Sequence, residues 1–284
     1  MEKSYQSAIR ELPEQLQSKW EHLLTYIESL GSLAVGFSGG VDSTFLLAAA
    51  HEVLGDKAIA VTAVDASVPR RERREAEEFC KERGIRHFVC TVDPMQEDGY
   101  RHNSPDRCYY CKRCVFTEVG KVAKEQGIEY LAEGSNMDDL GDYRPGLKAA
   151  AELHVTCPLR EAKLNKQEIR DLSKALNLPT WSKPAFACLA SRFVYGEEIT
   201  VEKLQMIDQA EQFLIDRGFP AVRVRVHGDI ARIEVPAGDI VKIAADGMRE
   251  AVSEELGKIG FRFVTLDLSG YRTGSMNATL PGKE

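Results

Sequence analysis

Hydrophobic residues in the first half of the chain fall into short runs, with mixed polar and apolar segments between them. Four apolar runs predict buried strands, in SLAVGF and at 58–65, 86–93 and 128–135. The mixed segments predict helices at 13–30, 42–53, 70–84 and 111–127. Strands alternating with helices predict an α/β fold, in which a parallel sheet is covered on both faces and binds ligands at the carboxyl ends of its strands.

The pattern changes near Thr200. An amphipathic helix is predicted over 200–218, followed by two alternating strands in AVRVRVH and IARIEVP, a helix over 238–259 and a last strand in FRFVTLDL. This order describes a small α-β-β-α-β module of the α+β class. We therefore predict a large domain over 1–195 and a small C-terminal domain over 196–284, with the boundary in FVYGEEIT.

The amino-acid composition limits the kinds of binding partner that we expect. The 284 residues are 43% hydrophobic, which is ordinary for a packed protein, and the net charge of -7 gives no overall field that attracts nucleic acid. We therefore expect no nucleic-acid partner. The N-terminus is polar throughout and no run of about 18 apolar residues occurs, so we expect a cytoplasmic protein without a membrane span.

Seven cysteines, an odd number without a secretion signal, argue against a disulfide framework. Cys80, Cys90 and Cys157 occur singly in apolar or strand-like contexts, and we expect each to be a buried thiol without a chemical role. The cysteines expected to carry chemistry are Cys108, Cys111, Cys114 and Cys188.

The segment from Ser38 to Thr44, SGGVDST, leaves the first predicted strand and enters a helix. Backbone N–H groups and the helix dipole make an anion site at such a turn, and Gly39 and Gly40 let the backbone approach phosphate closely. Asp42 would repel phosphate directly and is better suited to hold a Mg²⁺ ion that contacts it. The hydroxyl donors in this segment are Ser38, Ser43 and Thr44.

SGGVDST resembles the pyrophosphate-loop (PP-loop) motif of the N-type ATP pyrophosphatases, which include GMP synthetase, NAD synthetase, asparagine synthetase and tRNA-thiolating enzymes. The segment lacks the Gly-Lys-Ser/Thr of kinase-type loops. The resemblance implies an enzyme that binds ATP, transfers AMP to a substrate oxygen and releases pyrophosphate. Ser135 and Asn136 follow the fourth predicted strand, so we expect them at the nucleotide edge of the sheet.

Five stretches together resemble the LarE-type ATP-dependent sulfur transferases, along nearly the whole chain: GFSGGVDST, RCYYCK at 107–112, EGSNMDD at 133–139, KPAFACLASR at 183–192 and GYRTGSMN at 270–277. The resemblance implies that a pyridinium-3,5-biscarboxylate mononucleotide is converted to its thiocarboxylate, in the biosynthesis of a nickel-pincer cofactor. It also implies a homo-oligomer, and the family suggests a hexamer.

In this resemblance Cys188 is the nucleophile. Acyl-adenylate formation gives the carboxylate a good leaving group, and the thiolate then attacks the acyl carbon. We expect Lys183 and Arg192 to lower the pKa of Cys188. β-Elimination from the thioester would give the sulfur to the substrate and leave dehydroalanine, so that each chain would react once.

The resemblance also extends to family members thought to hold a [4Fe-4S] cluster on three cysteines, which match Cys108, Cys111 and Cys188. In those members an exogenous sulfide would be the sulfur source, and each chain could react repeatedly. Cys114 extends the pattern to C-x-x-C-x-x-C, and either replaces one ligand or faces the core; Glu118 stands where a ferredoxin run has its next cysteine. The alternatives for Cys108 and Cys111 are two unligated thiols or a zinc pair.

Arg223 and Arg225 alternate on one strand, so their side chains share a face and are candidates to clamp the substrate's phosphate. The alternative is a solvated basic strand. Glu211, Glu234 and Asp239 offer oxygen ligands for a divalent metal, but here the pattern favours a solvated acidic face.

Two other functions remain open at this level. A tRNA thiolase would share the loop and a three-cysteine cluster, although the acidic charge argues against it. A nucleotide-binding sensor would hold ATP or AMP without chemistry, and binding would then be unchanged by Cys188→Ala. An amidotransferase-fed synthetase is disfavoured, because no glutaminase domain fits in 284 residues.

Overall fold

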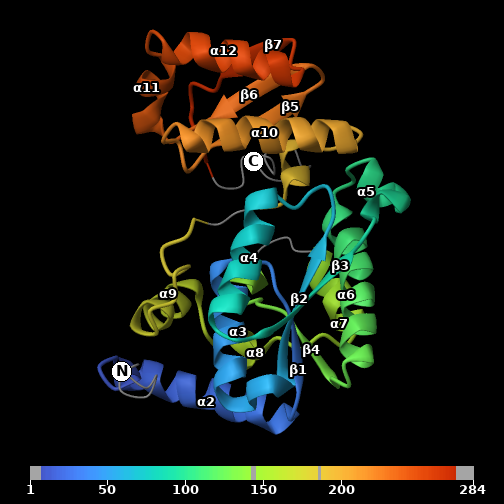
Figure 1. Cartoon of the computed structure of the whole chain (residues 1–284), viewed down its shortest axis with the longest axis vertical. Coiled ribbons are helices and arrows are strands. Elements are labelled where there is room, and N and C mark those ends of the chain that lie inside the picture. Colours follow the sequence, from blue (N-terminus) through green and yellow to red (C-terminus); the bar gives the residue numbers. More distant parts are fainter. Residues whose placement is uncertain (1–7, 142–144, 185–186, 273–284) are drawn as a thin grey trace. The chain divides into compact units, whose positions relative to one another are not determined.

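A computed structural model of the chain describes residues 8–141, 145–184 and 187–272, and the chain divides into two compact units (Figure 1). The second unit comprises Ala66–Pro69, Met95–Arg107 and the chain from Ala187 onward, and the first comprises the remainder. The second unit thus takes three segments from within the range predicted as the large domain, namely 66–69, 95–107 and 187–195. The domain boundary at 195/196 itself stays a prediction.

A parallel sheet organises the first unit. In the described residues its strands pair in the order β3-β2-β1-β4 and run in the same direction. They are β1 (Leu33–Gly36), β2 (Ala58–Val64), β3 (Arg86–Thr91) and β4 (Tyr130–Ala132). A bridge between Ala132 and Thr156 extends the sheet beyond β4. The predicted α/β fold with a parallel sheet is confirmed, although the fourth strand is shorter than the range predicted for it.

Helices cover both faces of this sheet, because alternate residues of each strand face opposite sides (Figure 1). Leu33, Val35 and Phe37 pack into one core, whereas Ala34 and Ile59 pack into another. The first core includes residues of α2 (Glu14–Leu30), α3 (Val41–Leu54), α4 (Arg70–Glu82), α8 (Pro158–Glu161) and α9 (Lys166–Ala175). The second core and its neighbour include residues of α6 (Arg107–Glu125) and α7 (Pro145–Glu152).

Helix α3 lies at the centre of the first unit, and nearly every residue from Val41 to Ala50 is buried. A helix that is apolar around its whole circumference needs neighbours on every side. It packs against β1, β2, α2 and α9. This enclosure fixes its N-terminal turn, and therefore the polar segment that precedes it, at the carboxyl end of β1.

In the second unit, β5 (Arg223–His227) pairs antiparallel with β6 (Ile230–Glu234), and β6 pairs parallel with β7 (Phe263–Leu266). The helices of this unit are α5 (Asp98–Arg101), α10 (Val201–Asp216), α11 (Ile240–Ala244) and α12 (Met248–Ile259). The helix predicted over 238–259 is thus two helices. Ala245 is extended and Gly247 has φ of +80°, a conformation that interrupts an α-helix.

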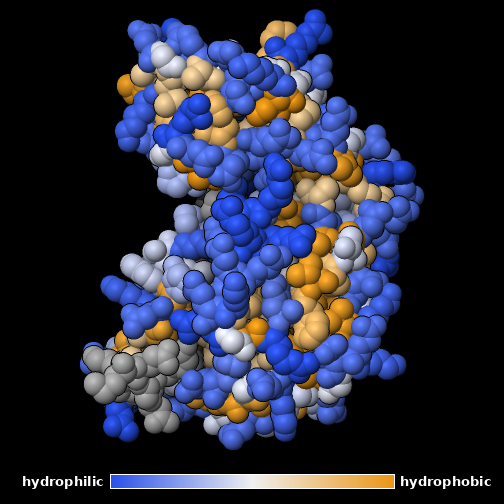
Figure 2. Space-filling model, in the orientation of Figure 1, coloured by the Kyte–Doolittle hydropathy of each residue, from blue (hydrophilic) through white to orange (hydrophobic). Residues whose placement is uncertain are grey.

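The surface in Figure 2 is mainly hydrophilic, with small hydrophobic areas scattered over it. Among the described residues, no helix is both long enough and apolar enough to cross a membrane.

Candidate active site

The segment Ser38 to Gly40 forms a tight loop between β1 and α3. Gly39 has φ of +70°, a left-handed conformation that side chains rarely adopt, and Gly40 caps the helix with extended backbone. Ser38 Oγ lies 3.0 Å from Ser43 Oγ, and the Gly40 N–H donates to Ser38 Oγ at 3.4 Å. Amide and hydroxyl donors therefore gather at the start of α3, as an anion site requires.

Asp42 stands in the first turn of α3, and its carboxylate has two polar neighbours. Lys166 Nζ donates to Asp42 Oδ2, and Asn136 Nδ2 donates to Oδ1 at 3.3 Å. The Asp42 and Lys166 side chains are 24% and 30% exposed, so both remain accessible to a ligand. The structure thus brings the predicted residues Asp42 and Asn136 together.

Lys166 was not predicted from the sequence. It begins helix α9, where Asn165 and Glu168 form a capping box. The pattern Asn-Lys-Gln-Glu is a recognisable signal for a helix start. It locates the lysine at a helix N-terminus, but only the folded chain places that terminus beside Asp42.

The loop after β4 packs closely on the segment from Ser38 to Thr44, which we call the phosphate loop. A Cβ on Gly134 would lie 2.9 Å from the backbone nitrogen of Ser43, so only glycine fits there without a backbone shift. Next to it, the Ser135 hydroxyl donates to Glu133 Oε1 at 2.7 Å, and Lys112 of α6 pairs with the other oxygen of Glu133. Ser135 and Asn136 are buried at this edge of the sheet, and their contact with a nucleotide stays a prediction.

Lys183 contacts the phosphate loop. Its ammonium donates to the Gly39 carbonyl oxygen at 3.1 Å and to carboxylate oxygens of Glu72 and Glu75, each at 2.7 Å. We expected Lys183 to lower the pKa of Cys188. Its three donors have acceptors within the first unit, and an effect of Lys183 on Cys188 stays a prediction.

Cys188 belongs to the second unit and precedes a short 3-10 helix, Leu189–Arg192. Arg192 is fully buried and pairs with both carboxylate oxygens of Glu211, at 2.8 and 2.9 Å. Its third nitrogen donates to the carbonyl oxygens of Ala187 and Cys188 at 2.8 and 3.2 Å. Arg192 therefore fixes the backbone that carries Cys188.

Arg223 and Arg225 are buried, so a solvated basic strand is wrong. Arg225 forms two parallel hydrogen bonds of 2.9 Å with Glu234, and Arg223 lies over the ring of Tyr271, 5.0 Å from its centroid. Burial and the neighbouring Arg192 guanidinium lower the pKa of Arg223. A phosphate-binding role for the two arginines stays a prediction.

The three acidic candidates do not form a solvated face. Glu211 and Glu234 are 0% and 1% exposed, each held in an arginine ion pair, and Asp239 pairs with Lys242. Within residues 8–141, 145–184 and 187–272, no group of three histidine, cysteine or acidic side chains is arranged to hold a metal ion.

Three cysteines lie along α6, which begins earlier than predicted and so includes Cys108 as well as Cys111 and Cys114. Cys108 is exposed, whereas Cys111 and Cys114 are half-buried. Thiols three positions apart lie on adjacent turns, a spacing that suits two ligands of one cluster. Cys188 lies in the other unit, so a cluster on Cys108, Cys111 and Cys188 stays a prediction.

Of the cysteines expected to be buried, Cys80 is buried, whereas Cys90 and Cys157 are half-buried. Burial raises the pKa of Cys80 to about 12. Burial, together with the nearby Glu133 carboxylate, raises the pKa of Cys157 to about 11. Both thiols are therefore protonated at neutral pH and are poor nucleophiles.

No family model matches the chain, but individual proteins do. It is 41% identical over 265 residues to an uncharacterised protein of Synechocystis sp., covering 93% of this chain and 99% of the relative. It is 38% identical to the pyridinium-3,5-bisthiocarboxylic acid mononucleotide synthase of Lactiplantibacillus plantarum, covering 93% of this chain and 96% of the relative. A more distant relative, 27% identical over 75% of this chain and 70% of its own length, is one chain of the glutamine-hydrolysing GMP synthase of Archaeoglobus fulgidus.

The two similarities agree with the geometry, since the match to the mononucleotide synthase spans nearly the full length of both proteins and the GMP synthase chain is a PP-loop relative. The chain therefore belongs to the family of the pyridinium-3,5-bisthiocarboxylic acid mononucleotide synthases, the LarE-type sulfur transferases of the PP-loop superfamily.

Proposed function

We propose that this chain is an ATP-dependent sulfur transferase of nickel-pincer cofactor biosynthesis. Its substrate is a pyridinium-3,5-biscarboxylate mononucleotide, and its product is the corresponding thiocarboxylate. The observation that carries the proposal is the glycine loop at the start of α3, with Asp42 beside it, in a chain 38% identical to the Lactiplantibacillus plantarum synthase. Neither a tRNA thiolase nor a sensor has a comparable observation in its favour.

In the first half-reaction, a carboxylate oxygen of the substrate attacks the α-phosphorus of ATP. The bond between the α-phosphorus and the oxygen that bridges it to the β-phosphorus breaks. Pyrophosphate leaves with that electron pair. The amides at the start of α3 are suited to stabilise its negative charge, with hydroxyl donors from Ser38, Ser43 and Thr44. Asp42 fits a Mg²⁺ ligand, because its oxygens lie beside the loop and are exposed to solvent in part. Ser135 and Asn136 would line the nucleotide.

In the second half-reaction, the Cys188 thiolate attacks the acyl carbon and AMP leaves. Arg192 supports this role, because it holds the carbonyl oxygens on either side of the Cys188 amide nitrogen and so limits the motion of the nucleophile. Of the two arginines predicted to bind the mononucleotide phosphate, Arg223 is the better candidate to supply the positive charge, because Arg225 is held by Glu234 and by the Ser191 carbonyl oxygen. Loss of the Cys188 α-proton and cleavage of its Cβ–S bond would then leave sulfur on the substrate and dehydroalanine in the chain.

The sulfur source is a separate question. A [4Fe-4S] cluster held by Cys108, Cys111 and Cys188 would let an exogenous sulfide serve as the sulfur source. The sulfur atom of Cys188 would then not be consumed. This source would be supported if anaerobically purified protein contains iron and acid-labile sulfide. Both should be lost when any one of these three cysteines is replaced by alanine, and both should be retained in Cys90→Ala. The cluster would be excluded as the sulfur source if the protein stays colourless after anaerobic reconstitution and if the residue at Cys188 is lighter by the mass of H₂S after the reaction.

We further propose that the chain acts in the cytoplasm as a homo-oligomer, with a hexamer as the family suggests, and that its two domains meet near residue 195. Sedimentation velocity tests the assembly, and limited proteolysis near FVYGEEIT tests the boundary.

The test of the reaction compares the wild type with Cys188→Ala, using Cys90→Ala as a matched control. With ATP and the biscarboxylate mononucleotide, we expect Cys188→Ala to release pyrophosphate and form no thiocarboxylate, whereas Cys90→Ala should do both. Substrate-dependent pyrophosphate release carries the first half of the proposal. Its absence from the wild type would contradict that half, and thiocarboxylate formation by Cys188→Ala would contradict the role of Cys188.

A further inference from the structure

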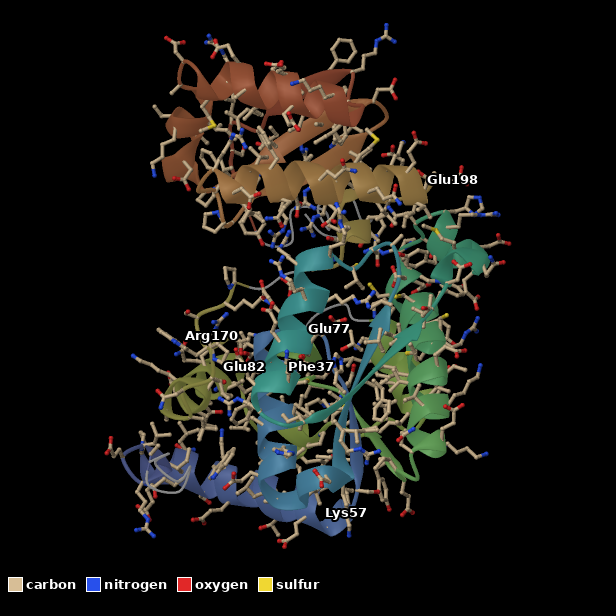
Figure 3. All side chains as sticks on the ribbon, viewed as in Figure 1. Phe37, Lys57, Glu77, Glu82, Arg170 and Glu198 are labelled. Carbon is tan, nitrogen blue, oxygen red and sulfur yellow. The ribbon has the colours of Figure 1, made fainter. Side chains whose placement is uncertain are left out.

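Lys183 is held more firmly than the other charges near the phosphate loop. An ammonium group has three N–H donors. Here they have three acceptors, the Gly39 carbonyl oxygen and carboxylate oxygens of Glu72 and Glu75, and the side chain is only 13% exposed. Its backbone is anchored as well, because Arg170 of α9, labelled in Figure 3, donates to the carbonyl oxygens of Trp181 and Lys183 at 2.6 and 2.9 Å.

The contact with Gly39 determines the orientation of one peptide group. In a planar trans peptide the C=O and the next N–H point in opposite directions. Lys183 draws the Gly39 oxygen toward α4, so the Gly40 N–H points the other way. It approaches Ser38 Oγ, which lies 3.0 Å from Ser43 Oγ, and thus joins the donors inside the loop.

This peptide joins two glycines, which rotate more easily than any other pair of residues because neither has a Cβ. With the peptide reversed, a carbonyl oxygen would replace the N–H inside the loop and repel an anion. We propose that Lys183 is a positioning residue that keeps the Gly39–Gly40 peptide in its anion-binding orientation. The ligand concerned is the β,γ-diphosphate part of ATP, and the pyrophosphate formed from it. This inference rests on the proposed ATP reaction.

The orientation can be observed directly, because Gly39–Gly40 is the one pair of consecutive glycines in the sequence. Protein labelled with ¹³C-carbonyl and ¹⁵N glycine gives a single peptide signal in an HNCO spectrum. We expect this signal to shift in ligand-free Lys183→Met and to stay in place in Lys81→Met, which removes an exposed lysine from α4. A lysine that acted only by touching the phosphate would leave the ligand-free signal unchanged, and that result would overturn the proposal.

Binding of the non-reacting analogue α,β-methylene-ATP provides the second measurement. We expect Lys183→Met to raise its dissociation constant by about tenfold or more, the effect of roughly one strong hydrogen bond, and to leave that of AMP within about twofold. No binding to the wild type would indicate failure of the proposed function itself. Wild-type binding with an unchanged constant in Lys183→Met would overturn only the inference.

Charge must be separated from orientation, because Lys183→Met also removes the positive charge that pairs with Glu72 and Glu75 near the loop. The double variant Lys183→Met/Glu75→Gln removes one of these negative charges without restoring the contact with Gly39. We expect the double variant to bind α,β-methylene-ATP as weakly as Lys183→Met. Recovery of wild-type affinity would show that net charge, and not peptide orientation, is the cause.

Discussion

The Asp42–Lys166 ion pair of the first unit and the Arg192–Glu211 and Arg225–Glu234 ion pairs of the second unit differ in their access to water. In the first unit, the Asp42 and Lys166 side chains beside the phosphate loop are 24% and 30% exposed. In the second unit, Arg192 and Glu211 are both 0% exposed, and Arg225 and Glu234 are 6% and 1% exposed. All are ion pairs, but only the first can exchange partners with a ligand without removing a charge from the protein interior.

This difference separates two uses of charge. Where water reaches an ion pair, its net stabilisation is small and a bound metal or phosphate replaces either partner at low cost. Where an ion pair is buried, loss of one partner leaves an unpaired charge in a medium of low polarity. The buried Arg192 and Arg225 pairs in the second unit therefore fix geometry, including the backbone at Cys188, whereas the pair at Asp42 is suited to binding.

The largest effect is expected from Glu211→Ala. It removes the two carboxylate oxygens that accept hydrogen bonds from Arg192, one of which also accepts from the Val224 N–H. We expect the free energy of unfolding to fall by about 3–5 kcal/mol, measured by urea denaturation. Glu202→Ala, an exposed glutamate on the same helix, should change it by less than about 0.5 kcal/mol. Equal stabilities of the two variants would break the contrast between the units.

A smaller effect is expected from Gly134→Ala in the first unit. The added Cβ would meet the backbone nitrogen of Ser43 at 2.9 Å, and neither backbone can move without shifting the phosphate loop. We expect a loss of about 1–3 kcal/mol in stability, together with weaker binding of α,β-methylene-ATP by calorimetry.

Gly146→Ala is the matched control. Its Cβ would lie 2.8 Å from Cδ of Lys112, a flexible side chain that can move aside. We expect nucleotide binding to be retained in this variant. If Gly134→Ala also bound the analogue normally, the close packing of the two loops would have no importance for the site.

The smallest effect concerns the thiols. The pKa of Cys157 is raised to about 11, whereas an unfolded cysteine ionises at about pH 8.5. The contribution of this thiol to stability is therefore complete below about pH 8.5 and is lost as the pH rises toward 11. We expect the wild type to lose more stability over this range than Cys157→Ala, as measured by urea denaturation. Parallel pH profiles for the two proteins would contradict the raised pKa.

Most of the regular elements were predicted from local pattern, but the helices α5, α7, α8 and α9 were not. The alternation of apolar strands with helices gave the parallel sheet, and the glycine loop at Ser38 was recognised because its function depends on consecutive residues. Errors occurred where local pattern is ambiguous. Helix α6 begins at Arg107 and not at 111, and the segment 238–259 is interrupted at Ala245–Gly247.

The pairing of charges was not predictable. Arg223 and Arg225 have the alternation of a strand, and Glu211 has the surroundings of a surface helix, but all three are buried. Lys166 and Glu133 were missed for the same reason. Their partners Asp42 and Lys112 lie 124 and 21 positions away, and local sequence carries no information on contacts at such separations.

The sequence by itself determined the strands of the parallel sheet, the helices that alternate with them, the phosphate loop and the family to which the chain belongs, because these depend on periodicity and on contiguous residues. Tertiary structure alone decided which charges are buried in pairs and which remain exposed beside the loop. It also directed Lys183 to the Gly39 carbonyl oxygen and Arg192 to the backbone of Cys188. These outcomes depend on the distances between segments remote in sequence, and such distances are set only when the apolar faces of the helices and strands pack together.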